Sequence, residues 1–188
     1  MKKIIFLFAF TAITYCTQAQ ITYGVKAGIN LTKFSGSDIG DNQFLVGFAG
    51  GGLINYKLAE AVSLQGELLY SLEGASYKGE GSSKIKAGYI NIPVLAQYNH
   101  ASGFYAETGP QVGFLISAKQ TYNGNSRDMK DDFKKINFSW GLGAGYKLTN
   151  GLGIGARYNF GIASIADDAS VRLGGFHIGL SYTFGADN

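Results

Sequence analysis

The chain has little of several residue types on which other protein classes depend. Among its 188 residues there are one cysteine and two histidines, and only 15% of the residues are charged. The one cysteine, Cys16, lies in an N-terminal segment that we expect to be removed, which would leave a mature chain without cysteine. Disulfides, thiolate metal sites and a cysteine nucleophile are then excluded.

The expected mature chain also lacks a large excess of positive or negative charge. The formal net charge is +3, and removal of Lys2 and Lys3 with the N-terminal segment leaves 14 basic against 13 acidic residues. A nucleic-acid partner would need a basic surface, so we expect none. The glycine-rich runs at 141–145 and 151–155 resemble phosphate-binding loops, but those loops join a strand to a helix, and these glycines alternate within strands. We therefore predict no cofactor and no bound metal.

Long apolar runs are absent except at the N-terminus. Two lysines at 2–3 precede an apolar run over residues 4–15, and small residues follow just before Gln20. This order is typical of a secretory signal peptide, and the run is shorter than the roughly 20 residues of a membrane-spanning helix. We predict a signal peptide over residues 1–19, cleaved before Gln20, and one domain over residues 20–188. A lipoprotein signal is the alternative, but Tyr15 stands where a small residue should precede Cys16.

Glycine and aromatic residues are abundant. There are 28 glycines, 12 tyrosines and 13 phenylalanines against two prolines, a balance that favours strands and tight turns over helices. Near the C-terminus apolar residues alternate strictly with glycine or polar ones: Phe176, Ile178, Leu180, Tyr182 and Phe184 share one face, and His177, Gly179, Ser181 and Thr183 share the other. This period of two indicates a strand. Similar segments at 23–31, 44–56, 62–70, 89–98, 104–117, 136–148 and 152–160 bring the expected number of strands to eight.

The connections between these segments alternate in length. Short turns lie near residues 58–61, 99–102 and 149–151, whereas longer loops are expected over residues 32–43, 72–85, 118–135 and 163–172. Membrane barrels pair short periplasmic turns with longer outer loops, so both termini should face the periplasm. Pro93 and Pro110 lie inside two of the strands, where proline donates no ladder hydrogen bond, and we expect them at bulges or strand ends.

The character of the two faces indicates which one meets lipid. The polar face is rich in Gly, Ser, Asn and Gln but poor in Lys and Glu within strands, which suits a narrow lumen better than a surface in water. Aromatic residues gather near both strand ends, as two membrane-interface girdles would require: Tyr23, Tyr56, Tyr98, Phe104, Tyr146 and Phe184 at one end, and Phe44, Tyr70, Phe114, Phe138 and Phe176 at the other. A soluble barrel with an aromatic core is the alternative. We predict an all-β fold, an eight-stranded antiparallel up-and-down transmembrane β-barrel.

Four segments resemble the PorT-like outer-membrane β-barrel domain proteins, often labelled porin family. They are residues 23–31, 64–71 and 89–95 and the glycine-rich run 141–157, and residues 179–184 resemble the closing strand of that family. The resemblance implies a cell outer membrane location in a Gram-negative envelope and this barrel fold, and it brings no agreed catalytic residue. One departure is that four residues follow Phe184, where outer-membrane barrels usually end on an aromatic residue that the assembly machinery recognises.

Five charged or ionisable residues fall on the inner face near the middle of their strands: Lys26, Glu67, Glu107, Arg157 and His177. A lone buried charge is costly, so we expect these residues to form a structural salt-bridge network. Because eight strands leave an interior only wide enough for side chains, a large open pore is not expected. A hydrolase-type arrangement of His177 with Ser181 is the enzymatic alternative, but four residues along a strand separate them by roughly 13 Å. We predict no catalytic residues and no enzyme activity.

The sequence predicts an envelope-structural or surface-interaction role without a large pore. The alternatives are an accessory of a protein-secretion system with the same fold, a soluble periplasmic ligand-binding barrel and a lipid-modifying barrel enzyme. Expected partners are outer-membrane lipid and lipopolysaccharide, the barrel-assembly machinery during insertion, and surface or secretion partners that meet the long loops. One such loop carries Asp128, Asp131 and Asp132 with Lys130, Lys134 and Lys135 and should be solvated, with cation or lipopolysaccharide contact as the minor alternative.

Overall fold

The computed structural model describes residues 21–37, 39–77, 83–122, 124–166 and 170–184. Its elements are β1 (Ile21–Ser35), β2 (Asn42–Ala59), β3 (Val62–Tyr77), β4 (Ser83–Asn99), β5 (Phe104–Tyr122), β6 (Asn125–Asp128), the 3₁₀ helix η2 (Lys130–Asp132), β7 (Ile136–Lys147), β8 (Leu152–Gly161) and β9 (Arg172–Phe184). In this part of the chain no helix is long and apolar enough to cross a membrane. The predicted signal peptide lies outside the described residues, so cleavage before Gln20 stays a prediction.

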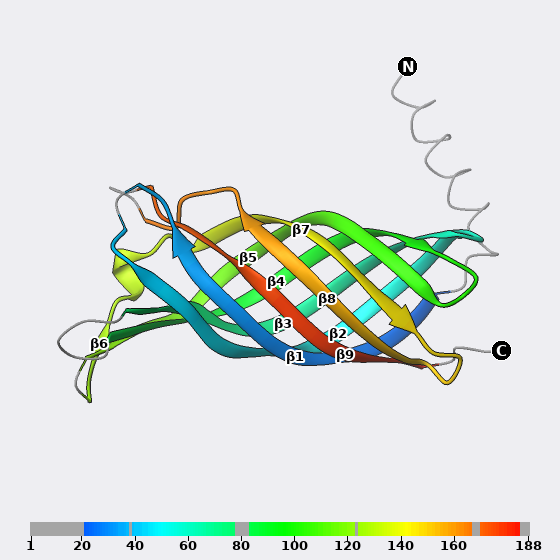
Figure 1. Cartoon of the computed structure of the whole chain (residues 1–188), viewed down its shortest axis with the longest axis horizontal. Coiled ribbons are helices and arrows are strands. Elements are labelled where there is room, and N and C mark those ends of the chain that lie inside the picture. Colours follow the sequence, from blue (N-terminus) through cyan, green and yellow to red (C-terminus); the bar gives the residue numbers. More distant parts are fainter. Residues whose placement is uncertain (1–20, 38, 78–82, 123, 167–169, 185–188) are drawn as a thin grey trace, which may run out of the picture.

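The strands form a closed ring because the first and the last of them pair. β1 pairs with β2 on one side and with β9 on the other, with Gly28 opposite Gly179. The remaining long strands pair in chain order, and β5 pairs with both β4 and β7. β6 pairs with the end of β5 and projects beyond the barrel at the left of Figure 1. Without β6, eight of the nine strands form the ring, and the predicted eight-stranded antiparallel barrel is confirmed.

The two ends of the barrel differ in their connections. Tight turns join β2 to β3, β4 to β5 and β7 to β8, and we call this end the short-turn end. Residues 148–151 form one of these turns, in which the amide of Gly151 donates to the carbonyl of Leu148 at 3.1 Å. Gly151 has a φ of 85°, a left-handed conformation that favours glycine. The opposite end, which we call the long-loop end, carries β6, η2 and residues 162–166 and 170–171 between β8 and β9.

The strands extend further towards the long-loop end than the sequence pattern predicts. A loop was expected over residues 72–85, but β3 continues to Tyr77 and β4 begins at Ser83. Rungs such as Glu73 opposite Ala87 belong to this extension. The alternation of apolar and polar residues fades there, whereas backbone pairing depends on the amides alone and continues.

Both prolines lie inside strands, and the expectation that they mark bulges or strand ends is wrong. β3 and β4 keep the same register on both sides of Pro93, but no residues pair between the pairs Gly66–Val94 and Leu69–Asn91. The ladder between β4 and β5 is likewise interrupted beside Pro110 without a change of register. Each proline therefore removes backbone hydrogen bonds to one neighbouring strand. The side chains of its own strand still alternate between the lumen and the outer face.

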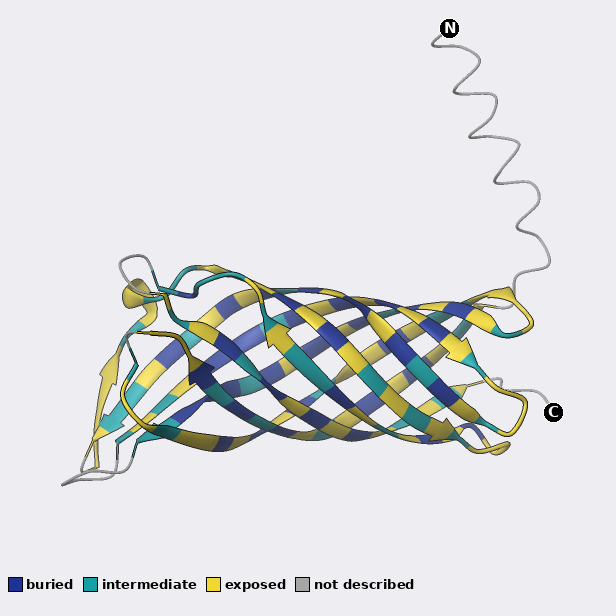
Figure 2. Ribbon diagram, turned by 45° about the horizontal axis from the view of Figure 1, so that its top comes forward, coloured by how far each residue is buried: buried dark blue, intermediate teal, exposed yellow. Residues whose placement is uncertain are grey.

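Side chains alternate between the lumen and the outer face along every long strand, as the bands of buried and exposed residues in Figure 2 show. Ten of the eleven aromatic residues predicted to point outward are between 39% and 59% exposed, and Tyr56 is half-buried. On this face the indole nitrogen of Trp140 donates to the hydroxyl of Thr108 at 2.9 Å, and that hydroxyl donates to the carbonyl of Gly141 at 3.0 Å. A polar group facing hydrocarbon needs such an internal partner.

Candidate functional site

Four charged side chains from four strands meet in the middle of the lumen, and we call them the lumen ion cluster: Lys26 of β1, Glu67 of β3, Glu107 of β5 and Arg157 of β8. The guanidinium of Arg157 donates to both carboxylate oxygens of Glu67 at 2.7 and 3.1 Å, and its Nε donates to Glu107 at 2.8 Å. Lys26 Nζ lies 2.9 Å from Glu67. All four residues are at most 8% exposed. Two positive charges thus balance two negative ones where water has little access.

Glycines of β7 make room for this cluster. Gly143 of β7 lies between Glu107 on one neighbouring strand and Arg157 on the other. A β-carbon at Gly143 would stand 3.1 Å from Cβ of Arg157, and one at Gly141 would stand 2.9 Å from its Cδ. The glycine-rich alternation of β7 therefore allows the long arginine side chain to lie across the lumen and reach two carboxylates.

His177 lies beside the lumen ion cluster but is not joined to it by an ion pair in the described residues. Its Nδ1 hydrogen-bonds to Oδ1 of Asn30 at 2.9 Å, although the β8–β9 register places it opposite Arg157. Asn30 in turn donates to the backbone carbonyls of Phe48 and Leu72. Four of the five predicted lumen residues are therefore brought together by ion pairs, and the fifth bonds to an amide. The enzymatic alternative needed His177 to meet Ser181, and the described hydrogen bond of His177 goes to Asn30 instead.

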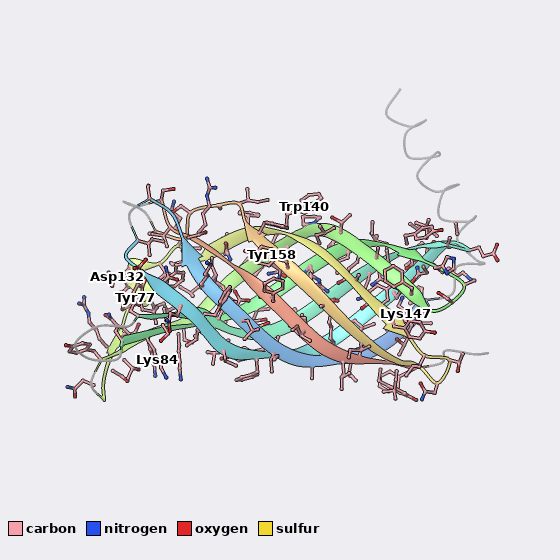
Figure 3. All side chains as sticks on the ribbon, viewed as in Figure 1. Tyr77, Lys84, Asp132, Trp140, Lys147 and Tyr158 are labelled. Carbon is pink, nitrogen blue, oxygen red and sulfur yellow. The ribbon has the colours of Figure 1, made fainter. Side chains whose placement is uncertain are left out.

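Amide side chains extend the polar network from the lumen ion cluster towards the short-turn end. Gln97 donates to Glu107 at 2.9 Å and accepts from both Asn55 and Lys147, at 3.0 and 2.9 Å. Lys147 also donates to Asn99 at 2.8 Å, and Figure 3 shows Lys147 towards the right-hand, short-turn end of the barrel. These residues could not be singled out from the sequence, because uncharged amides on an inward face give no signal beyond the alternation itself.

A polar cavity of about 330 Å³ lies at the short-turn end. Hydroxyls and amides from β1, β2, β3 and β9 line it, among them Thr22, Asn55, Ser63 and Thr183. Lys147, at the inner part of this wall, also faces the ring of Tyr105, with its nitrogen 5.0 Å from the ring centre. The short-turn end of the lumen is thus polar and accessible to water.

The outermost part of the lumen at the long-loop end is apolar, whereas the sequence pattern indicated an inner face rich in Gly, Ser, Asn and Gln. Its buried members, which we call the apolar cap, are Phe34, Ala75, Ala87, Tyr89, Leu115, Ala118, Ile165 and Leu173. Ile165 comes from the connection between β8 and β9, and Met129 and Phe133, next to η2, pack against the cap. The carbonyl of Ile165 accepts from the amide of Lys134 at 2.8 Å. The long-loop connections thus fold over this end of the barrel and close it.

The described lumen offers no cluster of three or more histidine, cysteine or acidic side chains suited to a metal ion. Its chemistry is that of a filled interior: a polar cavity, a neutral cluster of four charges and an apolar cap follow one another along the barrel axis. Buried polar atoms without a partner among the described residues gather between the ion cluster and the cap.

A family model described as outer membrane protein beta-barrel domain matches residues 17–167. No curated protein matches the chain. Among solved structures, Neisserial surface protein A (NspA) is 16% identical with a TM-score of 0.50, and the match covers 88% of this chain and 99% of that one. Ail of Yersinia pestis, solved in complex with the heparin analogue sucrose octasulfate, is 15% identical with a TM-score of 0.54, and the match again covers 88% and 99%. These likenesses concern the fold.

Proposed function

The chain belongs to the outer membrane protein β-barrel domain family, and from this membership we propose that it is a closed barrel that acts through its long-loop end. It is an outer-membrane β-barrel protein of the Gram-negative envelope, and its proposed role is envelope-structural or surface-interacting, without catalysis. The observation that carries the proposal is the filled lumen. The ion cluster occupies its middle, and the apolar cap closes the long-loop end.

Because the lumen is closed, we predict that the protein conducts no solutes of the size of sugars. When the purified protein is reconstituted into planar lipid bilayers, we expect no stable conductance steps, and liposomes that contain it should take up sugars no faster than protein-free liposomes. A 16-stranded porin in the same lipids is the positive control, since barrels of that size leave an aqueous channel. Reproducible conductance steps from the folded protein would contradict the proposal.

A second candidate function is an accessory role in protein secretion, as the resemblance to PorT-like proteins suggests. It uses the same fold and the same long-loop end, and it is supported by the four PorT-like segments of the sequence. Deletion of the gene should then reduce the amount of secreted proteins in the medium, whereas a purely structural role should leave secretion unchanged. In both cases export through residues 1–19 and insertion by the barrel-assembly machinery are part of the proposal.

We also propose that lipopolysaccharide contacts a group of lysines on the outer face near the long-loop end. Lys86 of β4 stands directly opposite Lys119 of β5, and Lys84 follows on the same face of β4. Like charges directly opposite destabilise a strand pair unless an anion lies between them. Lys119 lies three residues beyond the exposed Ile116, which places it above the apolar band, and Asp128 on β6 pairs with it on the other side. Figure 3 shows Lys84 at this end of the barrel.

The double variant Lys86→Gln, Lys119→Gln should retain less lipopolysaccharide than the unchanged protein after mild detergent extraction. Each lysine near an anionic surface contributes about 1 kcal/mol, so we expect the bound amount at limiting lipopolysaccharide to fall about tenfold or more. Mass spectrometry of the co-purified lipid measures this. Lys57→Gln, an exposed lysine of β2 near the short-turn end, is the control and should change nothing. Equal retention by the double variant and the control would show that these lysines bind no lipid anion.

A further inference from the structure

A buried carboxylate in the long-loop half of the lumen has no positive partner among the described residues. Glu73 of β3 is 8% exposed, and Asn91 Nδ2 donates to its Oε1 at 2.6 Å. The described ion pairs of the lumen join Lys26 and Arg157 to Glu67 and Glu107 only. The four charges of the ion cluster already cancel, and Lys147 bonds to Gln97 and Asn99 towards the short-turn end, so an ionised Glu73 has no cation beside it among the described residues. An unpaired buried charge is costly enough to require compensation.

Oxygen atoms that lack a hydrogen-bond partner line a small cavity together with Glu73. They are Oδ1 of Asn137, Oγ of Ser139 and Oδ1 of Asn159. Asn137 and Ser139 are each 3% exposed, so bulk water does not satisfy these atoms. Native proteins rarely leave buried polar atoms unpaired, and several such atoms around one cavity indicate that something binds there.

The sheet register brings these groups to one level of the barrel. Asn137 and Ser139 project from the same face of β7, opposite Gly113 and Gln111 of β5. Gly113 also lies opposite Asn91, the hydrogen-bond partner of Glu73, so the polar residues form a continuous inner wall from β3 to β7. Asn137 and Ser139 are two residues apart on one strand, so their side chains both point into the lumen.

The cavity is small. The centre of a water molecule can move within a volume of about 10 Å³ there. This is room for about one water molecule or one ion of similar size. Leu173 of the apolar cap lines it on one side, and Asn30, which bonds to His177, lines it on the other. A ligand at this place would lie between the lumen ion cluster and the apolar cap.

We propose that Glu73, with the oxygen atoms of Asn137, Ser139 and Asn159, forms a buried site for a single monovalent cation of the size of Na⁺. Carboxylate, amide and hydroxyl oxygens are hard ligands that suit alkali and alkaline-earth ions and not soft metals. A monovalent ion would cancel the charge of Glu73, whereas a divalent ion would leave one positive charge buried. The described site has one carboxylate, and the described chain offers no cluster of three acidic, histidine or cysteine ligands.

The test compares folded barrels in NaCl and in choline chloride at equal ionic strength, after refolding of the full protein in each salt. The readout is the temperature at which the unboiled, compact species disappears on a gel. With Na⁺ about 100-fold above its dissociation constant, this temperature should rise by roughly 5–10 °C relative to choline. Glu73→Gln keeps the shape of the side chain and should abolish the difference between the two salts.

Two further variants keep the test decisive. Asp132→Asn removes an exposed carboxylate of η2 at the same end of the barrel and should retain the full Na⁺ effect. Ser139→Ala removes one neutral ligand and should require about tenfold more Na⁺ for the same shift. Equal temperatures of the unchanged protein in the two salts would mean that Glu73 is neutralised by a proton and would overturn the proposal. A persistent Na⁺ effect in Glu73→Gln would also overturn it.

Discussion

Replacement of Arg157 by alanine is expected to lower the free energy of unfolding by about 3–5 kcal/mol, the cost of removing one partner from a buried ion pair. Arg157 is 2% exposed and supplies three hydrogen bonds to two carboxylates from two other strands. Its removal would leave Glu107 without an ion-pair partner among the described residues, and Glu67 with Lys26 alone. Two carboxylates of the lumen ion cluster would then share one cation, Lys26.

Urea unfolding in lipid vesicles, followed by tryptophan fluorescence and gel migration, measures this change. Arg172→Ala is the matched control, because Arg172 is exposed at the start of β9 and its loss should change stability by less than about 0.5 kcal/mol. Arg157→Lys should fall between the two, since lysine keeps the charge but lacks the planar fork that reaches two carboxylates. If Arg157→Ala proved as stable as the control, the lumen ion cluster would not stabilise the barrel.

Replacement of Leu142 by arginine on the outer face should have the second large effect. Leu142 points outward from β7, is 58% exposed in the isolated barrel, and precedes Gly143, which lies opposite Arg157 of the ion cluster. It is therefore near the middle of the membrane, where an arginine on the lipid face costs about 2–4 kcal/mol. The measurement is the free energy of unfolding in vesicles, compared with that of the unchanged protein.

The control separates membrane depth from simple exposure. Leu58 lies near the end of β2 at the short-turn end and is also 58% exposed, so Leu58→Arg presents the same substitution outside the hydrocarbon. We expect a cost of about 0–1 kcal/mol there. In a soluble barrel both arginines would meet water and the two variants would be equally stable. That outcome would contradict a lipid-facing outer surface at Leu142.

The inward and outward faces of the strands could be predicted because side chains alternate along a strand whatever it pairs with. Lys26, Glu67, Glu107 and Arg157 were assigned to the lumen on this basis, and all four are buried there. Glu73 was missed, because it lies where the alternation fades and the pattern favours a loop. The strand continues through it, since backbone hydrogen bonds to β4 require no particular side chain.

The apolar cap was missed for a different reason. Phe34 falls in the predicted loop 32–43, Leu173 directly follows the predicted loop 163–172, and Leu115 lies near the end of the strand predicted over 104–117. Apolar residues at such places give no sign of what they pack against when the sequence is taken alone. Their partner Ile165 lies in the connection between β8 and β9, which follows no periodic pattern. Only the folded chain brings this connection over the end of the barrel.

The eight ring strands, their two faces and the location that an apolar outside implies could be predicted from the pattern of residues, although not the full length of each strand. These properties are local, because each follows from a period of two within about ten residues. Which inward residues meet depends on the folded barrel. Arg157 and Glu67 are 90 positions apart and touch only because closure of the ring between β1 and β9 sets the relative level of every strand. Register and ring closure are properties of the whole sheet, and no single segment contains them.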